Sequence, residues 1–144
     1  MMEYSGRSVS MCPMGKDSFG PVVIHEGGGH GFGGLLDEYR YYAAELPSDD
    51  KNSIKSWRSK DPYYGYNLDL TGDRNKVHWA HYFDRPGYEA VSMYEGGCLY
   101  EYGVWRPEYI SCMEDNRPYY NAPSREAIVR RIMRASGKTF NMED

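Results

Sequence analysis

Regular patterns of hydrophobic and polar positions occupy only the two ends of this chain. Near the N-terminus, GRSVSMCPM alternates small polar with apolar residues, which predicts a short edge strand over Arg7–Cys12 that Pro13 ends. Near the C-terminus, Asn121-Ala-Pro-Ser124 carries good capping residues, and we predict a helix over 124–136 that Gly137 ends. The apolar positions on one face of this helix are Ala127, Ile128, Ile132 and Ala135.

The middle of the chain is less regular. Lys16–Gly20 reads as a turn, and Pro21 suits the first turn of a helix that continues through Val22-Val23-Ile24. The polar segment 41–75 predicts a long surface excursion with little regular structure. Val77–Phe83 is an apolar and aromatic patch that suits a short strand or a helix equally, and Glu95-Gly96-Gly97 predicts a turn.

Composition limits the classes of function. The 144 residues are enough for one domain with one core, so we treat 1–144 as a single domain. A net charge of −4 gives no electrostatic argument for a nucleic-acid partner. The mean hydropathy of −0.77, without a long apolar run, predicts no membrane span. The three cysteines form no CxxC pair; Cys98 and Cys112 either form a disulfide or remain thiols.

Candidate chemistry gathers in one stretch, VVIHEGGGHGFGGLLDEY, residues 22–39. Two imidazoles, a carboxylate beside the first and a carboxylate downstream are the groups that a catalytic zinc helix requires. His25 and His30 are the candidate ligands, and Glu26 is the candidate general base. Gly33-Gly34 would end the helix, and Leu35-Leu36 would then dock the turn that leads to the acidic pair.

The spacing of the histidines conflicts with a regular helix. Residues five apart in an ideal α-helix are separated by about 140° of rotation, so the two rings would point away from each other. They converge only if the turn is widened by one residue, as in a π-bulge, and the three intervening glycines make such distortion sterically easy. Six glycines would cost a helix about 5–6 kcal/mol relative to alanine, so packing or a bound metal must stabilise it.

Two other interpretations of the same stretch remain open at this point. Gly29–Gly34 matches the dinucleotide-binding pattern G-x-G-x-x-G, with Pro21–Ile24 as the preceding strand, although no acidic residue ends a strand some twenty positions later. A glycine-rich loop with surface histidines is the plainest interpretation. It leaves the clustering of HE, H and DE without an explanation.

The stretch HEGGGHGFGGLLDEY resembles the HExxH…GGLxDEY segment of the IgA-peptidase family of metzincin-like zinc peptidases. Further similarities follow in the family's order over nearly the whole chain: WAHYF at 79–83, MYEGG at 93–97, GVWRPEYISCM at 103–113 and NAPSREAIVRRI at 121–132. This chain departs from the family pattern by one extra glycine, since HExxxH replaces HExxH.

The resemblance implies an α+β, metzincin-like catalytic subdomain of a zinc-dependent endopeptidase, with Zn²⁺ as cofactor and a protein or peptide as substrate. It makes His25 and His30 ligands, Glu26 the base and Asp37 the third ligand, with Glu38 as the alternative. Ser111-Cys112-Met113 looks like the Met-turn, which would place Met113 as a hydrophobic floor beneath the zinc. The strand at Arg7–Cys12 would pair with the substrate backbone.

Several further expectations accompany that assignment. A catalytically weak or inactive module of the same fold is the principal alternative function. Only one strand precedes the zinc helix, so we expect the N-terminal sheet to be truncated and the chain to be the C-terminal part of a larger protein. The resemblance implies an extracellular or cell-envelope location, although the N-terminus lacks the apolar core of a signal peptide. Tyr119 or Tyr120 is the candidate for oxyanion stabilisation, and His78 and His81 are expected to pack in the aromatic patch.

Overall fold

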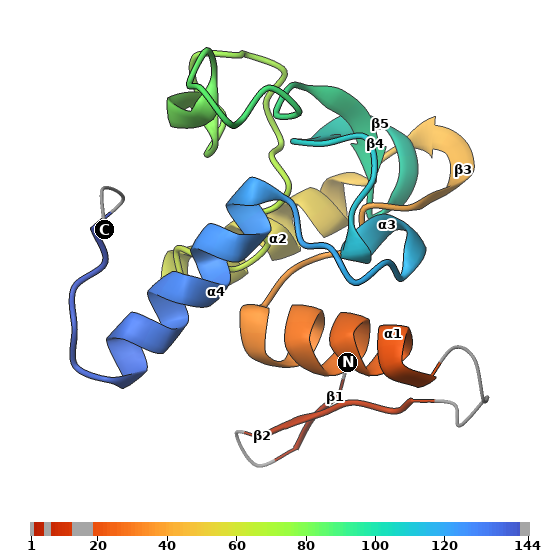
Figure 1. The fold of residues 1–144 in the computed structure, drawn as a ribbon. Helices are drawn as coiled ribbons and strands as arrows, with labels where there is room; N and C mark the ends of the chain where they lie inside the picture. Colours follow the sequence, from red (N-terminus) through yellow and green to blue (C-terminus); the bar gives the residue numbers. More distant parts are fainter. Residues whose placement is uncertain (1, 5–6, 13–18, 142–144) are drawn as a thin grey trace.

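The computed structural model describes residues 2–4, 7–12 and 19–141, and it is a mixed α+β fold, as predicted (Figure 1). A hairpin lies beside a long helical segment, and a small sheet lies on the other side of that segment. In chain order the elements are β1 (Met2–Tyr4), β2 (Arg7–Val9), α1 (Phe19–Val23), the π-helix η1 (Ile24–Gly33), β3 (Arg40–Glu45), α2 (Ser48–Lys60), the 3₁₀ turn η2 (Ala80–Tyr82), β4 (Tyr94–Gly97), β5 (Leu99–Arg106), α3 (Cys112–Asp115) and α4 (Ala122–Ala135).

The larger sheet has three strands in the order β3-β5-β4. β5 pairs in parallel with β3 and antiparallel with β4, so β5 is central and β3 lies at an edge. The N-terminal strand exists but stops at Val9, and it pairs antiparallel with β1. The expectation of a single strand before the helical segment was therefore wrong, since both β1 and β2 precede it in the described residues. Pro13 and most of the expected turn at Lys16–Gly20 lie outside the described residues, and Phe19 and Gly20 open α1 instead of closing that turn.

The expectation of little regular structure over 41–75 was wrong. Most of β3 and the whole of α2 lie in this segment. The six residues of β3 are all exposed, and Ile54 is the one buried residue of α2, so neither element shows the hydrophobic period that predicts it. α2 instead has acidic residues in its first turn and basic residues in its last turn, which suits the helix dipole.

The predicted turn at Glu95-Gly96-Gly97 was also wrong, because these residues belong to β4. The chain reverses one step later, at Cys98 and Leu99, which both have positive φ angles, 49° and 74°. Non-glycine residues seldom adopt that region, so the glycine pair was the stronger turn signal in the sequence. Gly97 instead leaves room for the Leu68 side chain. A Cβ at position 97 would lie 2.9 Å from that side chain.

The C-terminal helix was predicted almost correctly. α4 begins at Ala122 rather than at 124, and the Asn121 side chain accepts a hydrogen bond from the Ser124 N–H at 3.0 Å. Gly137 follows the helix with a φ of 70°. The apolar face of α4 is buried only in the N-terminal half of the helix, since Ala127 is fully buried and Ile132 is 49% exposed.

In the described part of the chain, the interior consists of three small apolar clusters rather than one large core. The aromatic patch at Val77–Phe83 forms one of them, as a 3₁₀ turn, with Val77, Trp79 and Tyr82 buried. The second lies between α2 and the sheet, and the third joins Leu35 and Met113 to α4 beside η1. Within the described residues, no helix is both long and apolar enough to span a membrane.

Candidate metal centre

A π-helix carries both histidines. η1 runs from Ile24 to Gly33, and its wider turns place residues five apart on neighbouring turns of the same face. The two imidazole rings converge because each turn of the helix is about one residue wider than in an α-helix, as the five-residue spacing of the histidines predicted. Gly34 ends the helix in the left-handed conformation, with a φ of 61°, as the glycine pair predicted. The G-x-G-x-x-G interpretation fails here, because helix α1 precedes the glycines where that pattern requires a strand.

Close packing explains two of the glycines in η1. A Cβ at Gly29 would overlap the sulfur of Met113, and a Cβ at Gly28 would lie 2.5 Å from the Tyr120 hydroxyl. Gly27, by contrast, faces open space. The glycine run therefore brings the helix backbone against the Met113 and Tyr120 side chains, in addition to easing the wide turn.

Three donor atoms meet at one point. His25 Nε2 and His30 Nε2 are 3.2 Å apart, and Asp37 Oδ1 lies 3.0 Å from each of them. The edge of a tetrahedron of ligands around zinc, with bonds of about 2.0 Å, is about 3.3 Å. The two imidazoles and the carboxylate therefore fit the ligand set of a single zinc ion, with one position left for water or substrate.

The ring orientations are set by backbone carbonyls. His25 Nδ1 lies 2.8 Å from the Cys112 carbonyl, and His30 Nδ1 lies 2.7 Å from the Leu35 carbonyl. A carbonyl only accepts hydrogen bonds, so both Nδ1 atoms carry a proton, and the Nε2 atoms are the ones that could bind a metal after losing their own protons. This is the usual outer-shell arrangement for histidine ligands of a metal.

Electrostatics tie the cluster together. Burial lowers the pKa of His30, but the hydrogen bond and charge of Asp37 outweigh it, and the net pKa is raised. Burial raises the pKa of Asp37, but the hydrogen bonds to His25 and His30 hold that pKa well below its usual range. The two shifts describe a contact between an imidazolium and a carboxylate. A cation bound between these groups would take over the role of the His30 proton.

Glu38, the alternative third ligand, points away from the histidines. Its side chain is fully buried and accepts hydrogen bonds from Asn67 Nδ2, Asn121 Nδ2 and Ser111 Oγ, each at 2.7 Å. Burial raises the pKa of Glu38 to about 7, although these three donors act in the opposite direction. Glu38 thus links the turn after η1 to α3 and α4.

The segment predicted as the Met-turn lies directly against η1. Met113 is fully buried, its carbonyl accepts a hydrogen bond from the Glu38 N–H at 2.8 Å, and Ser111 caps the short helix α3. Its sulfur contacts the backbone at Gly29, between the two histidines in sequence. Cys98 and Cys112 are free thiols, so the disulfide considered from the sequence is not formed.

A cleft of about 530 Å³ lies beside the cluster, and of the three candidate ligands it is His25 that lines it. Its lining includes His25 and Glu26 from η1, Tyr39–Tyr41 at the start of β3, and Glu114–Asn116 from α3. The Glu26 carboxylate and the donor nitrogens of the two histidines all lie within 4.8 Å of one another. Asp37 Oδ1 lies closer to both histidines, 3.0 Å from each Nε2, so the geometry favours Asp37 over Glu26 as the third candidate ligand.

The two tyrosines named from the sequence bond to groups outside the cluster. The Tyr119 hydroxyl donates to Glu108, and the Tyr120 hydroxyl donates to the Ile24 carbonyl, so both have structural partners. Tyr39 instead lies over the cluster, with its ring stacked on His25 at 6.3 Å between centroids. Its position two residues after Asp37 was the available signal. The other two histidines pair with acids outside this cluster: His78 with Asp69 and His81 with Glu126, each at 2.9 Å.

No protein-family model matches this chain, and the comparison with curated proteins found no match.

Proposed function

We propose that this chain is the catalytic part of a zinc-dependent endopeptidase of metzincin-like type, with His25, His30 and Asp37 as the zinc ligands. The convergence of three donor atoms within 3.2 Å, beside Glu26 in an open cleft, carries this proposal. The resemblance of the surrounding motifs to the IgA-peptidase family supports the same class. An extracellular or cell-envelope location is proposed from that resemblance alone.

The residues divide the work of peptide hydrolysis. Zinc, when bound, supplies a Lewis acid for the scissile carbonyl and makes a water molecule acidic. Glu26, which lines the same cleft as His25, would accept the proton from the attacking water and pass it to the leaving amine. The carbonyls of Cys112 and Leu35 would hold the two imidazole rings in orientation, with both Nε2 atoms directed toward the metal position. Burial of His25 would limit the access of solvent to its ring.

The decisive experiment measures metal and activity together in the purified chain. We expect about one zinc per chain by elemental analysis, lost in His25→Ala and in His30→Ala. Glu26→Gln should keep the zinc and lower the cleavage of unstructured peptides by about 10²–10⁴-fold, since a general base contributes that much.

Other outcomes separate the alternatives. Zinc without cleavage of any peptide would favour the inactive module of the same fold. Iron in place of zinc would redirect the assignment, because two histidines and one carboxylate are also the ligands of non-haem iron oxygenases. A chain that binds no metal would remove the proposal altogether.

A further inference from the structure

Asn67 has a fully buried side chain that bonds to both sequence neighbours of Asp37. Its Nδ2 donates to the Leu36 carbonyl at 2.8 Å and to Glu38 Oε1 at 2.7 Å, and its Oδ1 accepts from the Leu36 N–H at 3.0 Å. These bonds use both amide protons of Asn67 and both main-chain polar groups of Leu36. Asn67 lies in the polar segment 41–75 and belongs to none of the motifs that carry the family resemblance.

The bonds to Leu36 imitate a neighbouring β-strand. An antiparallel strand partner also accepts from the N–H and donates to the C=O of the residue opposite it. The bond to Glu38 then fixes the residue on the other side of Asp37. Asp37 therefore lies between two held residues, and its backbone cannot shift without breaking a buried hydrogen bond, which is costly because the freed groups stay away from water.

The tip of the β4–β5 hairpin holds the same segment. The Cys98 N–H donates to the Asp37 carbonyl at 2.8 Å, and the Leu99 N–H donates to the Tyr39 carbonyl at 3.1 Å. Cys98 and Leu99 have positive φ angles, which are unfavourable for non-glycine residues and persist only where the surrounding structure determines the backbone closely. The segment that carries Asp37 is thus held by main-chain contacts as well as by Asn67.

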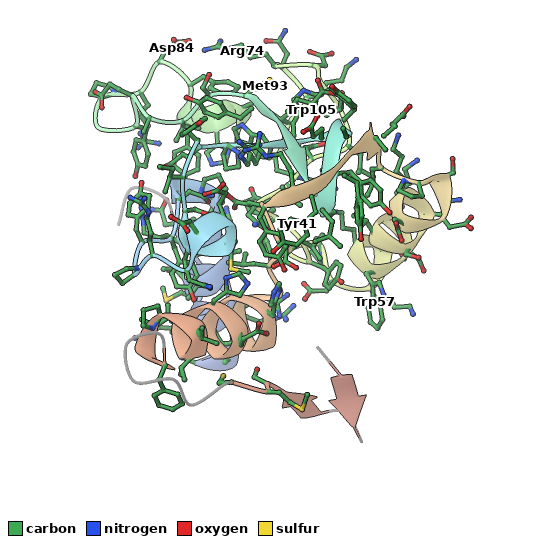
Figure 2. The ribbon with its side chains drawn as sticks, turned by 90° about the vertical axis from the view of Figure 1, so that its right-hand side faces the viewer. Tyr41, Trp57, Arg74, Asp84, Met93 and Trp105 are labelled. Carbon is green, nitrogen blue, oxygen red and sulfur yellow. The ribbon has the colours of Figure 1, made fainter. Side chains whose placement is uncertain are left out.

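The segment that carries Asn67 is itself anchored to the larger sheet. Two residues after Asn67, the main chain of Asp69 exchanges two hydrogen bonds of 2.8 Å with Trp105 of β5. Figure 2 shows Trp105 on the sheet and Tyr41, four residues after Asp37, between the sheet and the helical segment that carries the histidines. Asn67 therefore ties the turn between η1 and β3 to the sheet.

The contacts with Leu36 set Asn67 apart from the other partners of this segment. Glu38 has two further donors, Asn121 Nδ2 and Ser111 Oγ, each at 2.7 Å, so its side chain would remain anchored without Asn67. In the part of the chain that the structure describes, no other side chain bonds to the main chain of Leu36. Loss of the Asn67 amide would therefore release the backbone before Asp37 and leave Glu38 in place.

We propose that Asn67 is a positioning residue of the metal centre, which holds the backbone on both sides of Asp37 so that Oδ1 meets the Nε2 atoms of His25 and His30. The proposal rests on the proposed metal site. Oδ1 lies 3.0 Å from each nitrogen, and an outer-shell partner that fixes a ligand is typically worth about 10–100-fold in metal affinity.

The test compares two matched substitutions. Asn67→Asp keeps an acceptor for the Leu36 N–H and loses both donors, whereas Asn121→Asp keeps the cap of α4 and loses its donor to Glu38. Both place a second carboxylate beside Glu38, so that cost to the fold is shared. Asn67→Asp should weaken zinc binding by about 10–100-fold, and Asn121→Asp should leave it within about twofold. Competition with a chromophoric chelator measures the affinity.

Cobalt(II) in place of zinc reports the geometry of the site, because its visible absorption bands depend on the arrangement of the ligands. Asn67→Asp should change the positions and intensities of these bands, and Asn121→Asp should not. A purely structural role would lower the melting temperature of the metal-free chain and leave the spectrum of the loaded chain unchanged. If Asn67→Asp does not fold, Asn67→Ser tests the same claim, since it removes the amide without adding a charge.

Unchanged affinity and spectrum in the folded Asn67 variant would overturn the proposal. Equal losses in the two variants would also overturn it, because they would assign the effect to Glu38. If the unmodified chain binds zinc and cobalt but cleaves no peptide, the peptidase function fails, and the comparison of the two variants still decides the role of Asn67. A chain that binds neither metal would remove both proposals.

Discussion

Two neighbouring carboxylates have opposite roles at the scale of single residues. Asp37 lies 3.0 Å from both histidine nitrogens, whereas Glu38 is buried among the amides of Asn67 and Asn121. The segment is extended where it pairs with the start of β5, and successive side chains of an extended chain point to opposite sides. The Asp37 side chain therefore faces the histidines, and the Glu38 side chain faces the interior.

Glu38→Ala should lower the free energy of unfolding by about 3 kcal/mol, because three buried donors would lose their acceptor. Denaturant unfolding measures this change. Glu38→Gln should lower the free energy of unfolding much less. The carbonyl of the new side chain can still accept hydrogen bonds from both asparagine amides, and the Ser111 hydroxyl can accept one from its amino group. Asp37→Ala is the opposite control: it should abolish zinc binding with a small change in stability. If Glu38→Gln abolishes zinc binding and Asp37→Ala does not, the ligand assignment is wrong.

Sequence reasoning selected the pair but could not decide between its members with the residues alone. Asp37 and Glu38 are adjacent in sequence, and both side chains are carboxylates with the same ligand chemistry. Partners distant in sequence, Asn67, Ser111 and Asn121, make the distinction. The same holds for Tyr39, whose contact with His25 depends on how the chain turns after η1.

The element that matters most is η1. Its hydrogen bonds span one residue more than those of an α-helix, and Met113 and Tyr120 pack against its glycines. The irregular helix is thus held by tertiary contacts as well as by its own backbone.

Gly29→Ala tests this packing. We expect a loss of about 1–3 kcal/mol in unfolding free energy, since the new methyl group would overlap the Met113 sulfur. Gly27→Ala is the matched control within the same helix. Its methyl group would meet nothing within 4 Å, so it should stabilise the chain by about 0.5–1 kcal/mol. Equal effects of the two substitutions would contradict the packing described for η1.

The loop before η2 should confer a dependence on acid pH. Asp69 accepts hydrogen bonds from the N–H groups of Thr71 and His78 and pairs with the His78 ring at 2.9 Å. Burial raises the pKa of Asp69, but the contacts with His78 outweigh it and leave the pKa lowered. A lowered pKa stabilises the fold above the unfolded value of about 3.9, and that stabilisation is lost as the pH falls through the folded pKa.

Asp69→Asn should therefore lower the unfolding free energy at pH 7 by about 1–3 kcal/mol. The difference from the unmodified chain should shrink as the pH falls below about 4. Urea unfolding over a pH series measures this convergence. Asp84→Asn is the control, since Asp84 lies exposed in a loose pair with Arg74 and should change little at any pH. A constant difference across the series would remove Asp69 as the source.

At the scale of the whole molecule, the candidate metal centre brings together groups from three places along the chain. Its donors come from η1 and from the turn that leads into β3, and its outer shell includes the carbonyl of Cys112 in α3. With three small clusters in place of one core, a bound ion would add stability where the apolar packing is thin.

Zinc at a hundredfold excess over its Kd should raise the unfolding free energy by about 2.7 kcal/mol, and the melting temperature by roughly 5–10 °C. A chelator should reverse the shift. His30→Ala should show none, whereas His81→Ala, which removes an imidazole paired with Glu126, should keep the zinc-dependent shift. Scanning calorimetry of the three chains, with and without chelator, makes the comparison.

The sequence by itself determined what depends on local chemistry: the capped start of α4 and the glycine that follows it, the left-handed glycine that ends η1, and the set of groups around His25. It also showed that the two histidines could meet only in a widened helix. The tertiary structure decided the rest. It placed β3 and α2 in a polar segment, distinguished Asp37 from Glu38, and laid Tyr39 over His25. Those outcomes depend on partners far along the chain, which residue order alone does not bring together.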